Sequence, residues 1–218
     1  MEKSLEAVVT EGAAALGVEV SPEGVGRLLA YQAELLKWNA RVNLTAITDP
    51  GEAAEKHLVD SLSVVPEVQG ATDLLDLGAG AGLPGIPLAV ALPALKATLV
   101  DAVEKKVAFV KAGAVKAGVA GRVRAVHARA QGRPEEETLP RASVVISRAF
   151  MDVGPFLQLA KAYLAPGGRV VAMLGRAPPD DELWRVASAA GFMLGGVRRF
   201  ALPFSGAPRG VAVFHVEQ

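Results

Sequence analysis

The stretch that decides the fold is Leu74-Leu-Asp-Leu-Gly-Ala-Gly-Ala-Gly-Leu-Pro-Gly85. It begins as a short apolar run that carries an acid, Asp76, and then turns into a loop with glycine at positions 78, 80, 82 and 85. Glycine is needed where a backbone turns tightly or approaches a ligand closely. The pattern predicts a parallel strand that leads through a nucleotide-binding loop into a helix.

Strands and helices alternate from residue 72 onward. Apolar runs predict strands at residues 72–77, 96–100, 122–127, 142–147, 169–174, 195–201 and 210–216. Helical spacing predicts helices at residues 86–91, 105–117, 153–163 and 181–190. This order predicts an α/β fold with a doubly wound, Rossmann-like sheet covered by helices on both faces. Because only a loop joins the last two strands, we expect an antiparallel edge at the C-terminal end.

The first 70 residues differ from the rest because they contain only predicted helices. These helices cover residues 2–16, a segment from Pro22 to about Asn39, and a segment that follows Asp49-Pro50. Ser21 before Pro22 is a typical helix start. The composition changes near residue 70, so we expect an N-terminal helical cap over residues 1–70 and a sheet domain over residues 71–218.

The composition narrows the functional classes. The 218 residues are 51% hydrophobic, enough for one sizeable core, and include no cysteine, which excludes disulfides, zinc–thiolate sites and a thiol nucleophile. No apolar run approaches the roughly 20 residues of a membrane span. The charged N-terminus lacks a signal-peptide core, so a cytoplasmic location is expected.

The net charge is zero, but the charges are unevenly distributed. Residues 1–72 hold 5 Lys/Arg against 11 Asp/Glu, whereas residues 101–150 hold 10 against 5. The positive charge of residues 101–150 fits binding to a phosphate backbone. A solvated helix face explains the same charges equally well.

Asp76 bears on which nucleotide the loop binds. Residues 80–85 match a dinucleotide fingerprint, but a single match is weak. Asp76 lies two residues before the first glycine, where it would repel a pyrophosphate and attract the ammonium group of S-adenosylmethionine. Pro84 and Gly85 delay the helix start, which leaves its N–H groups poorly placed for a diphosphate. These residues favour S-adenosylmethionine over a nicotinamide dinucleotide.

Ligands of such sheets bind at the carboxyl ends of the strands. Asp101 ends the second predicted strand, where its carboxylate can accept hydrogen bonds from both ribose hydroxyls. Ala130 and Gln131 follow the third strand, where backbone groups can meet an adenine edge. Arg148 ends the fourth, where its guanidinium favours a carboxylate or phosphate ligand, or else a salt bridge to Asp101 or Asp76.

Four motifs resemble those of a known family. They are Trp38-Asn-Ala-Arg-Val-Asn-Leu-Thr-Ala-Ile47, Lys56-His-Leu-Val-Asp-Ser-Leu62, Asp76-Leu-Gly-Ala-Gly-Ala-Gly-Leu-Pro-Gly-Ile-Pro87 and Val145-Ile-Ser-Arg-Ala-Phe150. With them, the chain resembles nearly end to end the bacterial small-subunit (16S) ribosomal RNA guanine-N7 methyltransferases, also called the glucose-inhibited division protein B family. The two N-terminal motifs make the match specific, since a glycine loop alone is common to many methyltransferases.

The resemblance implies a class I methyltransferase fold and methyl transfer from S-adenosylmethionine to the N7 atom of a guanine in the decoding region of 16S rRNA. With the glycine loop included, the implied cofactor site comprises Asp76, Gly78, Gly80, Gly82, Leu83, Asp101, Ala102, Val103, Ala130, Gln131 and Arg148. The chain departs from the family at Gln131, where an acid is frequent. It also departs at Leu174, where a lysine is usual and Arg176 would have to supply the lost charge.

The N7 atom of neutral guanine carries a lone pair and no proton, so its methylation needs alignment and exclusion of water rather than a general base. Positive charge passes to the guanine ring, where amide oxygens would stabilise it. Asn39 and Asn43, the only asparagines, are therefore catalytic candidates together with Arg148. The alternative is that both asparagines cap or turn the chain after the helix that carries Trp38.

Other polar residues of the N-terminal motifs and of the basic stretch are expected to face the RNA. This set is Arg41, Thr45, Lys56, His57, Asp60, Ser61, Lys105 and Lys106. His57 and Asp60 lie one helical turn apart, either at the mouth of the RNA site, or as a pair on the helix surface or a clamp between cap and sheet. Trp38 and Phe150 would stack a splayed base or else belong to the core.

Three other functions stay open at this point. A methyltransferase acting on a small molecule or a protein agrees with the zero net charge. A nicotinamide-dependent oxidoreductase uses the same kind of sheet, and a non-catalytic ribosome-binding factor would keep the fold without turnover. No metal-ligand spacing stands out, and we expect a monomer because no exposed apolar stripe is evident.

Overall fold

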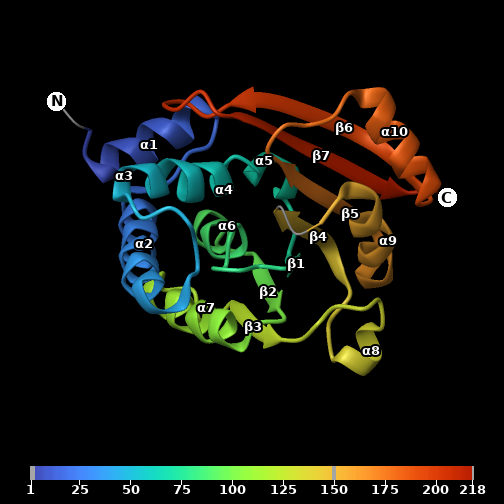
Figure 1. The fold of residues 1–218 in the computed structure, drawn as a ribbon, viewed down its shortest axis with the longest axis horizontal. Helices are drawn as coiled ribbons and strands as arrows, with labels where there is room; N and C mark the ends of the chain where they lie inside the picture. The colour runs from blue at the N-terminus through green and yellow to red at the C-terminus, as the bar shows by residue number, and fades with distance from the viewer. Residues whose placement is uncertain (1–2, 149–150, 218) are drawn as a thin grey trace.

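A computed structural model describes residues 3–148 and 151–217 of the chain. Its centre is a single sheet with the strand order β3-β2-β1-β4-β5-β7-β6 (Figure 1). The strands are β1 (Asp73–Leu77), β2 (Lys96–Asp101), β3 (Val123–His127), β4 (Ala142–Arg148), β5 (Leu164–Leu174), β6 (Phe192–Ala201) and β7 (Pro208–Val216). Each predicted strand is present, and β5 and β6 begin earlier than their apolar runs indicated.

The pairing of the strands creates the ligand crevice. Strands β3, β2, β1, β4 and β5 pair in parallel, whereas β7 pairs antiparallel with both β5 and β6. The predicted doubly wound sheet with an antiparallel C-terminal edge is therefore confirmed. The chain changes direction of winding between the neighbouring strands β1 and β4, and ligands of such sheets bind at the carboxyl ends of these strands.

Helices flank the sheet and connect its strands. They are α1 (Leu5–Ala15), α2 (Pro22–Val42), α3 (Pro50–Ala53), α4 (Asp60–Leu62), α5 (Val65–Val68), α6 (Gly85–Ala91), α7 (Glu104–Lys116), α8 (Pro134–Glu137), α9 (Val153–Ala160) and α10 (Asp180–Ala189). The side chains of Ser4, Ser21 and Asp49 cap the first three helices by accepting a backbone N–H bond. Such caps satisfy donors that a helix start otherwise leaves unpaired.

The helix predicted after Asp49-Pro50 contains an irregularity that the sequence did not indicate. Between α3 and α4 the backbone adopts a π-helical segment, η1 (Ala54–Val59). A similar change occurs after α9, where the 3₁₀ segment η2 (Lys161–Tyr163) precedes β5. π-Helical turns inside α-helices occur frequently at functional sites, and η1 carries Lys56 and His57.

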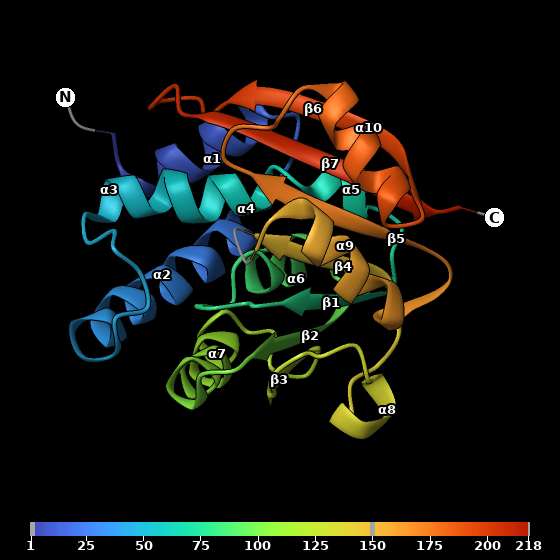
Figure 2. The same cartoon turned by 45° about the vertical axis from the view of Figure 1, so that its right-hand side comes forward.

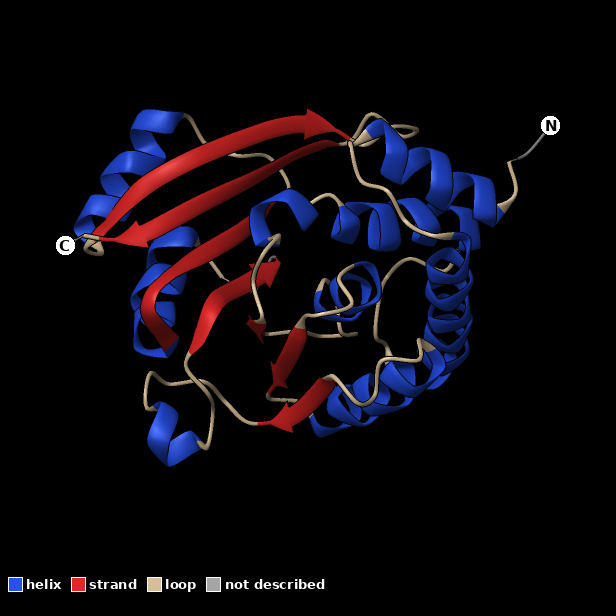
Figure 3. Cartoon of the chain, turned by 180° about the vertical axis from the view of Figure 1, so that it is seen from behind, coloured by secondary structure: helices blue, strands red, loops and turns tan. Residues whose placement is uncertain are grey.

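Two hydrophobic cores hold the helices against opposite faces of the sheet (Figures 2 and 3). Helices α9 and α10 cover one face, where Phe156 packs in the same core as Phe214 of β7. On the other face, Leu28 of α2 and Phe109 of α7 share a core with Leu74 of β1. The helices of residues 1–70 thus form part of the layer that covers the sheet.

Candidate active site

The glycine loop between β1 and α6 adopts the backbone that its sequence requires. Gly78, Gly80 and Gly82 have φ values of +72°, +57° and +85°, a region that side chains rarely occupy. Gly78 and Ala79 donate backbone N–H bonds to the carbonyl of Val100, at 2.9 and 3.0 Å, which fixes the loop to β2. A Cβ at Gly80 would have only the carbonyl oxygen of Gly78 within 4 Å, at 3.9 Å, so neighbouring atoms leave room beside this glycine.

Gly82 and Gly85 serve packing within the protein. A Cβ at Gly82 would lie 2.7 Å from Cδ1 of Ile86, and a Cβ at Gly85 would lie 2.7 Å from Cδ1 of Leu99. Both directions lead into the core. Gly82 thus lacks a side chain because helix α6 packs closely on the sheet, and its expected contact with the cofactor stays a prediction.

Asp76 is fully buried beneath the loop. Its Oδ2 accepts a hydrogen bond from the backbone N–H of Gly85 at 3.0 Å, whereas its Oδ1 has no partner among the described residues. Burial raises the pKa of the Asp76 carboxyl to about 7, against the lowering effect of the Gly85 N–H bond and of Arg148. A buried carboxylate oxygen without a donor is the feature that a cationic ligand would satisfy.

Asp101 closes the other side of this site at the end of β2. Its Oδ2 accepts a hydrogen bond from the N–H of Gly80 at 2.9 Å and its Oδ1 accepts one from the N–H of Val103 at 2.8 Å. Both oxygens keep acceptor capacity, because a carboxylate oxygen takes more than one hydrogen bond. Beside it lies a pocket of about 300 Å³, lined by Gly78, Val100, Asp101, Ala102, Lys106, Ala128, Arg129 and Ala130.

Gln131 does not line this pocket, although Ala130 does. The backbone N–H of Gln131 donates to the Tyr163 hydroxyl at 3.1 Å and to Glu137 at 2.8 Å. Its side-chain oxygen accepts a hydrogen bond from Arg133 at 2.5 Å. Protein contacts therefore take up the Gln131 backbone N–H, so a contact with an adenine edge would have to use its carbonyl or its side chain.

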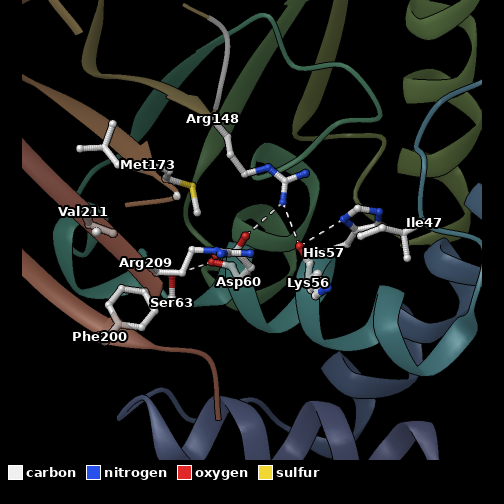
Figure 4. A pocket seen from close by; sticks show the side chains of 13 residues that line it. Ile47, Lys56, His57, Asp60, Ser63, Arg148, Met173, Phe200, Arg209 and Val211 are labelled. Carbon is white, nitrogen blue, oxygen red and sulfur yellow. Dashed lines mark hydrogen bonds and ion pairs between the residues drawn. The ribbon is translucent and has the colours of Figure 1, made fainter. Parts of the chain in front are cut away.

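A second pocket, of about 360 Å³, opens at the carboxyl ends of β4 and β5 (Figure 4). It is lined by Ile47, Lys56, His57, Asp60, Ser63, Arg148, Met173, Leu174, Gly175, Phe200, Arg209, Gly210 and Val211. Apolar side chains form one part of its wall, and a group of charged side chains forms the other. Its size and mixed lining suit a planar, polar molecule such as a nucleobase.

Asp60 is the centre of the charged group. Its Oδ1 accepts a hydrogen bond from Nε of Arg209 at 2.9 Å, and its Oδ2 lies 3.5 Å from Nη1 of Arg148. In Figure 4 both guanidinium groups point toward this carboxylate. Arg148 also donates to the carbonyl of Lys56 at 3.2 Å. The sequence anticipated Asp101 or Asp76 as a protein partner of Arg148, and the structure corrects this partner to Asp60.

His57 is linked to the end of α2 through Thr45. The Nε2 atom of His57 lies 2.8 Å from the Thr45 hydroxyl, and both backbone polar groups of Thr45 bond to the amide of Asn39, at 2.9 Å each. Burial lowers the pKa of His57 to about 4, with a further lowering from Arg148. At neutral pH His57 therefore carries no charge.

The two asparagines occupy the positions that the capping interpretation predicted. The Asn39 side-chain amide donates a hydrogen bond to the Thr45 carbonyl and accepts one from the Thr45 N–H. Asn43 ends α2 in the left-handed conformation with φ 49° and is exposed. Neither lines the second pocket. Hydrogen bonds within the chain thus fix the Asn39 amide, whereas the catalytic role expected for the two asparagines stays a prediction.

The remaining predicted RNA-facing residues separate into two groups. Ser61 is fully buried and its hydroxyl has no partner among the described residues, so it cannot meet an RNA, and this expectation is wrong. Arg41 and Lys105 are exposed, and Lys106 is half-buried. Trp38 packs edge-on against Phe109, with 5.7 Å between the ring centroids, which agrees with the prediction that Trp38 belongs to the core. Phe150 lies outside the described residues.

Two residues that the sequence analysis passed over belong to the site. Tyr31 of α2 donates its buried hydroxyl proton to the carbonyl of Ala81 in the glycine loop, at 2.6 Å. Arg209 of β7 binds Asp60 across 149 residues of chain. The sequence offered one weak indication for Tyr31, because tyrosine occurs only 2 times in the chain. For Arg209 no local pattern indicated a role.

The strand order, the glycine loop and Asp101 at the end of β2 define a class I methyltransferase fold. Solved structures share it. A methyltransferase from Thiobacillus denitrificans in complex with S-adenosyl-L-homocysteine has a TM-score of 0.59 and 14% identity, covering 84% of this chain and 97% of that chain. Another methyltransferase, from Geobacter sulfurreducens, has a TM-score of 0.55 and 16% identity, and the match covers 71% of this chain and 88% of that chain.

Sequence comparison places the protein more closely. The model of the family described as rRNA small subunit methyltransferase G matches residues 25–202. The ribosomal RNA small subunit methyltransferase G of Myxococcus xanthus is 59% identical and covers 94% of each chain. That of Anaeromyxobacter sp. strain Fw109-5 is 50% identical, over 97% of this chain and 98% of the relative. The chain belongs to this family of methyltransferases.

Two further findings concern the described part of the chain. None of its helices is long and apolar enough to cross a membrane. Residues 3–148 and 151–217 also contain no group of three or more histidine or acidic side chains placed to hold a metal ion.

Proposed function

We propose that the protein transfers a methyl group from S-adenosylmethionine to the N7 atom of a guanine in the decoding region of 16S rRNA. The observation that carries this proposal is the pairing of two pockets at the carboxyl edge of one sheet. The first, at Gly78 and Asp101, suits an adenosine moiety, and the second, at Arg148 and Asp60, suits a nucleobase. The names of the relatives, which specify small-subunit ribosomal RNA, support this substrate.

The residues of the first pocket fit S-adenosylmethionine. Asp101 can accept the ribose hydroxyls while it keeps its two backbone N–H bonds, and Gly80 leaves room for close approach. Asp76 is fully buried and does not line this pocket, so its unpartnered Oδ1 would meet the ligand ammonium group only if the glycine loop moves. Bound there, the cofactor supplies an electrophilic methyl group on a positively charged sulfur. The chain's own contribution is to orient that group toward the second pocket.

The second pocket fits a reaction in which the nucleophile loses no proton. His57 is neutral and bonded to Thr45, so it serves to hold the pocket wall rather than to move a proton. Arg148 uses only Nη1 for bonds to described residues, which leaves Nε and Nη2 to donate to a base oxygen such as the O6 atom of guanine. Alignment of this kind and exclusion of water account for a direct displacement.

Asp60 makes the pocket suitable for a base that becomes positively charged. Two arginines border the pocket, and without a counter-charge they would repel a methylated guanine. The Asp60 carboxylate contacts both and is itself only 4% exposed. In such a dry site a carboxylate stabilises positive charge more strongly than it does in water.

The direct test is to incubate the protein with radiolabelled S-adenosylmethionine and small ribosomal subunits from cells that lack the native modification. We expect label in the 16S rRNA, at a guanine that becomes sensitive to N7-specific cleavage. Label in a protein or small-molecule fraction instead would overturn the RNA assignment. Loss of S-adenosylhomocysteine binding in Asp101→Ala by calorimetry checks the cofactor site independently.

A further inference from the structure

The largest group of cations without an ion pair to a described residue lies along α7 and β3. Elsewhere, several exposed arginines pair with carboxylates, as Arg27 does with Glu23 and Arg185 with Asp181. Outside this region, Lys37, Arg41, Lys96 and Arg176 also have no ion pair to a described residue. Along α7, β3 and the loop that follows, the side chains without an ion pair to any described residue are Lys105, Lys106, Lys111, Lys116, Arg124 and Arg129. We call this set the basic face.

The charge of this region has no local compensation. Between residues 102 and 132 the basic face shares the sequence with one further cation, Arg122, and with one acid, Glu104. Arg122 is not available to a ligand, because its guanidinium donates to the carbonyls of Ala89, Leu92 and Leu95 at the end of α6. The six cations of the basic face thus form a local excess of positive charge on a protein whose net charge is zero.

The basic face begins at the cofactor pocket and leads away from it. Lys106 and Arg129 line that pocket. Lys111 and Lys116 lie farther along α7 and are exposed, as is Arg124 on β3. In both Figure 1 and Figure 2, α7 and β3 lie side by side at one end of the molecule. The 13 residues of α7 extend for about 20 Å, which exceeds the length of a single nucleotide.

The N-terminal helices have the opposite charge. Residues 1–72 hold 5 Lys/Arg against 11 Asp/Glu, which would repel a phosphate backbone. We propose that the basic face holds the phosphate backbone of the RNA over several nucleotides, and that the N-terminal residues line only the pocket for the target base. This inference rests on the proposed function and shifts most of the RNA contact away from the helical cap.

The test is the salt dependence of RNA binding. Each phosphate that a cation neutralises contributes about 0.7–0.9 to the slope of log K against log salt concentration. We therefore expect Lys111→Gln/Lys116→Gln to reduce the slope for small-subunit ribosomal RNA by about 1.5. Lys161→Gln/Arg185→Gln removes the same charge from the segments on the opposite face of the sheet, η2 and α10, and should leave the slope unchanged. Calorimetry should show equal S-adenosylhomocysteine affinity for both variants and the wild type.

The outcomes separate this inference from the proposed function. If wild-type protein places no label on ribosomal RNA, the proposed function fails. If the wild type labels the RNA but the two double variants give the same slope, the basic face does not bind the backbone and the inference is overturned. A smaller slope in the α7 variant alone, with cofactor affinity retained, supports it.

Discussion

The hydroxyl of Tyr31 donates a hydrogen bond to the backbone carbonyl of Ala81, at 2.6 Å, and both groups are buried. This bond ties α2 to the glycine loop. The Tyr31 ring packs on Phe109 of α7 and contacts the position of Gly113, where an added Cβ would lie 3.1 Å from it. Helix α2 also holds Thr45 through Asn39, and Thr45 contacts His57, so one helix supports both the glycine loop and a wall of the second pocket.

Replacing Tyr31 by phenylalanine removes this bond and keeps the ring. The Ala81 carbonyl is then buried without a donor, which costs about 1–3 kcal/mol of stability. Because the loop loses one of its fixed points, we expect the affinity for S-adenosylhomocysteine to fall roughly 3- to 10-fold, as a loss of about 1 kcal/mol would produce. Calorimetry well below the unfolding temperature measures this effect.

Ser143→Ala is the matched control for that experiment. Its hydroxyl donates to the carbonyl of Asp73 at 2.9 Å, at the amino end of the sheet and away from both pockets. It should lower the unfolding temperature without changing the cofactor affinity. Equal affinities in Tyr31→Phe and wild type would show that the bond serves stability alone.

Local patterns predicted the strands and the longer helices of this protein, but not the short helices α5 and α8 or the long-range contacts. The glycine loop, the alternation of strands and helices, and the position of Asp101 follow from short-range sequence features, and the structure contains them. Asp60 and Arg209 are far apart in the chain and carry no shared pattern, so only the folded sheet reveals their pairing. Ser61 appeared polar and accessible in its motif, yet the helix turns it into the core.

Asp101→Asn tests the cofactor site with little change in shape. The two oxygens of Asp101 accept N–H bonds from Gly80 and Val103, and an amide can keep only one of these acceptors. We expect the affinity for S-adenosylhomocysteine to drop at least 10-fold, since hydrogen bonds to a charged acceptor contribute about 1.5–3 kcal/mol. Asp73→Asn is the control, because Asp73 lies at the amino end of β1 and lines neither pocket. It should bind S-adenosylhomocysteine with wild-type affinity. An unchanged affinity in Asp101→Asn would contradict the ribose contact.

Asp76 and His57 should affect the pH dependence of stability in opposite directions. The pKa of Asp76 is raised from 3.8 to about 7 in the folded protein, so the unfolded chain loses this proton first and stability falls as pH rises from about 4 to 7. The pKa of His57 is lowered from 6.5 to about 4, so the unfolded chain gains this proton first and stability falls as pH drops below 6.5. Between about pH 4 and 6.5 the two effects oppose each other.

Single variants should separate these two contributions. Relative to the wild type, Asp76→Asn should show stability that increases more steeply with pH between 4.5 and 6.5, by up to about 1.4 kcal/mol per pH unit. His57→Gln should show the reverse change over the same range. Urea unfolding at a series of pH values measures both. Parallel curves for the wild type and either variant would refute the assignment for that residue.

Asp60→Asn tests whether the pocket needs a negative charge beside its two arginines. The variant keeps the shape of the side chain but leaves Arg148 and Arg209 without a counter-charge, so a guanine that gains positive charge is repelled. We expect kcat for methyl transfer to fall about 10- to 100-fold, a barrier increase of roughly 1.4–2.7 kcal/mol. Binding of S-adenosylhomocysteine should change little, because Asp60 does not line the first pocket.

Glu67→Gln is the control for this variant. Glu67 also binds an arginine, Arg198, at 2.7 and 2.9 Å, and its side chain is 12% exposed, but it lies outside both pockets. Removing one partner of either pair should lower stability, since each change leaves a partly buried arginine without its carboxylate. Single-turnover kinetics with saturating cofactor then distinguish the two. A similar loss of rate in both variants would mean that Asp60 acts through stability, whereas a loss confined to Asp60→Asn places its charge at the reacting base.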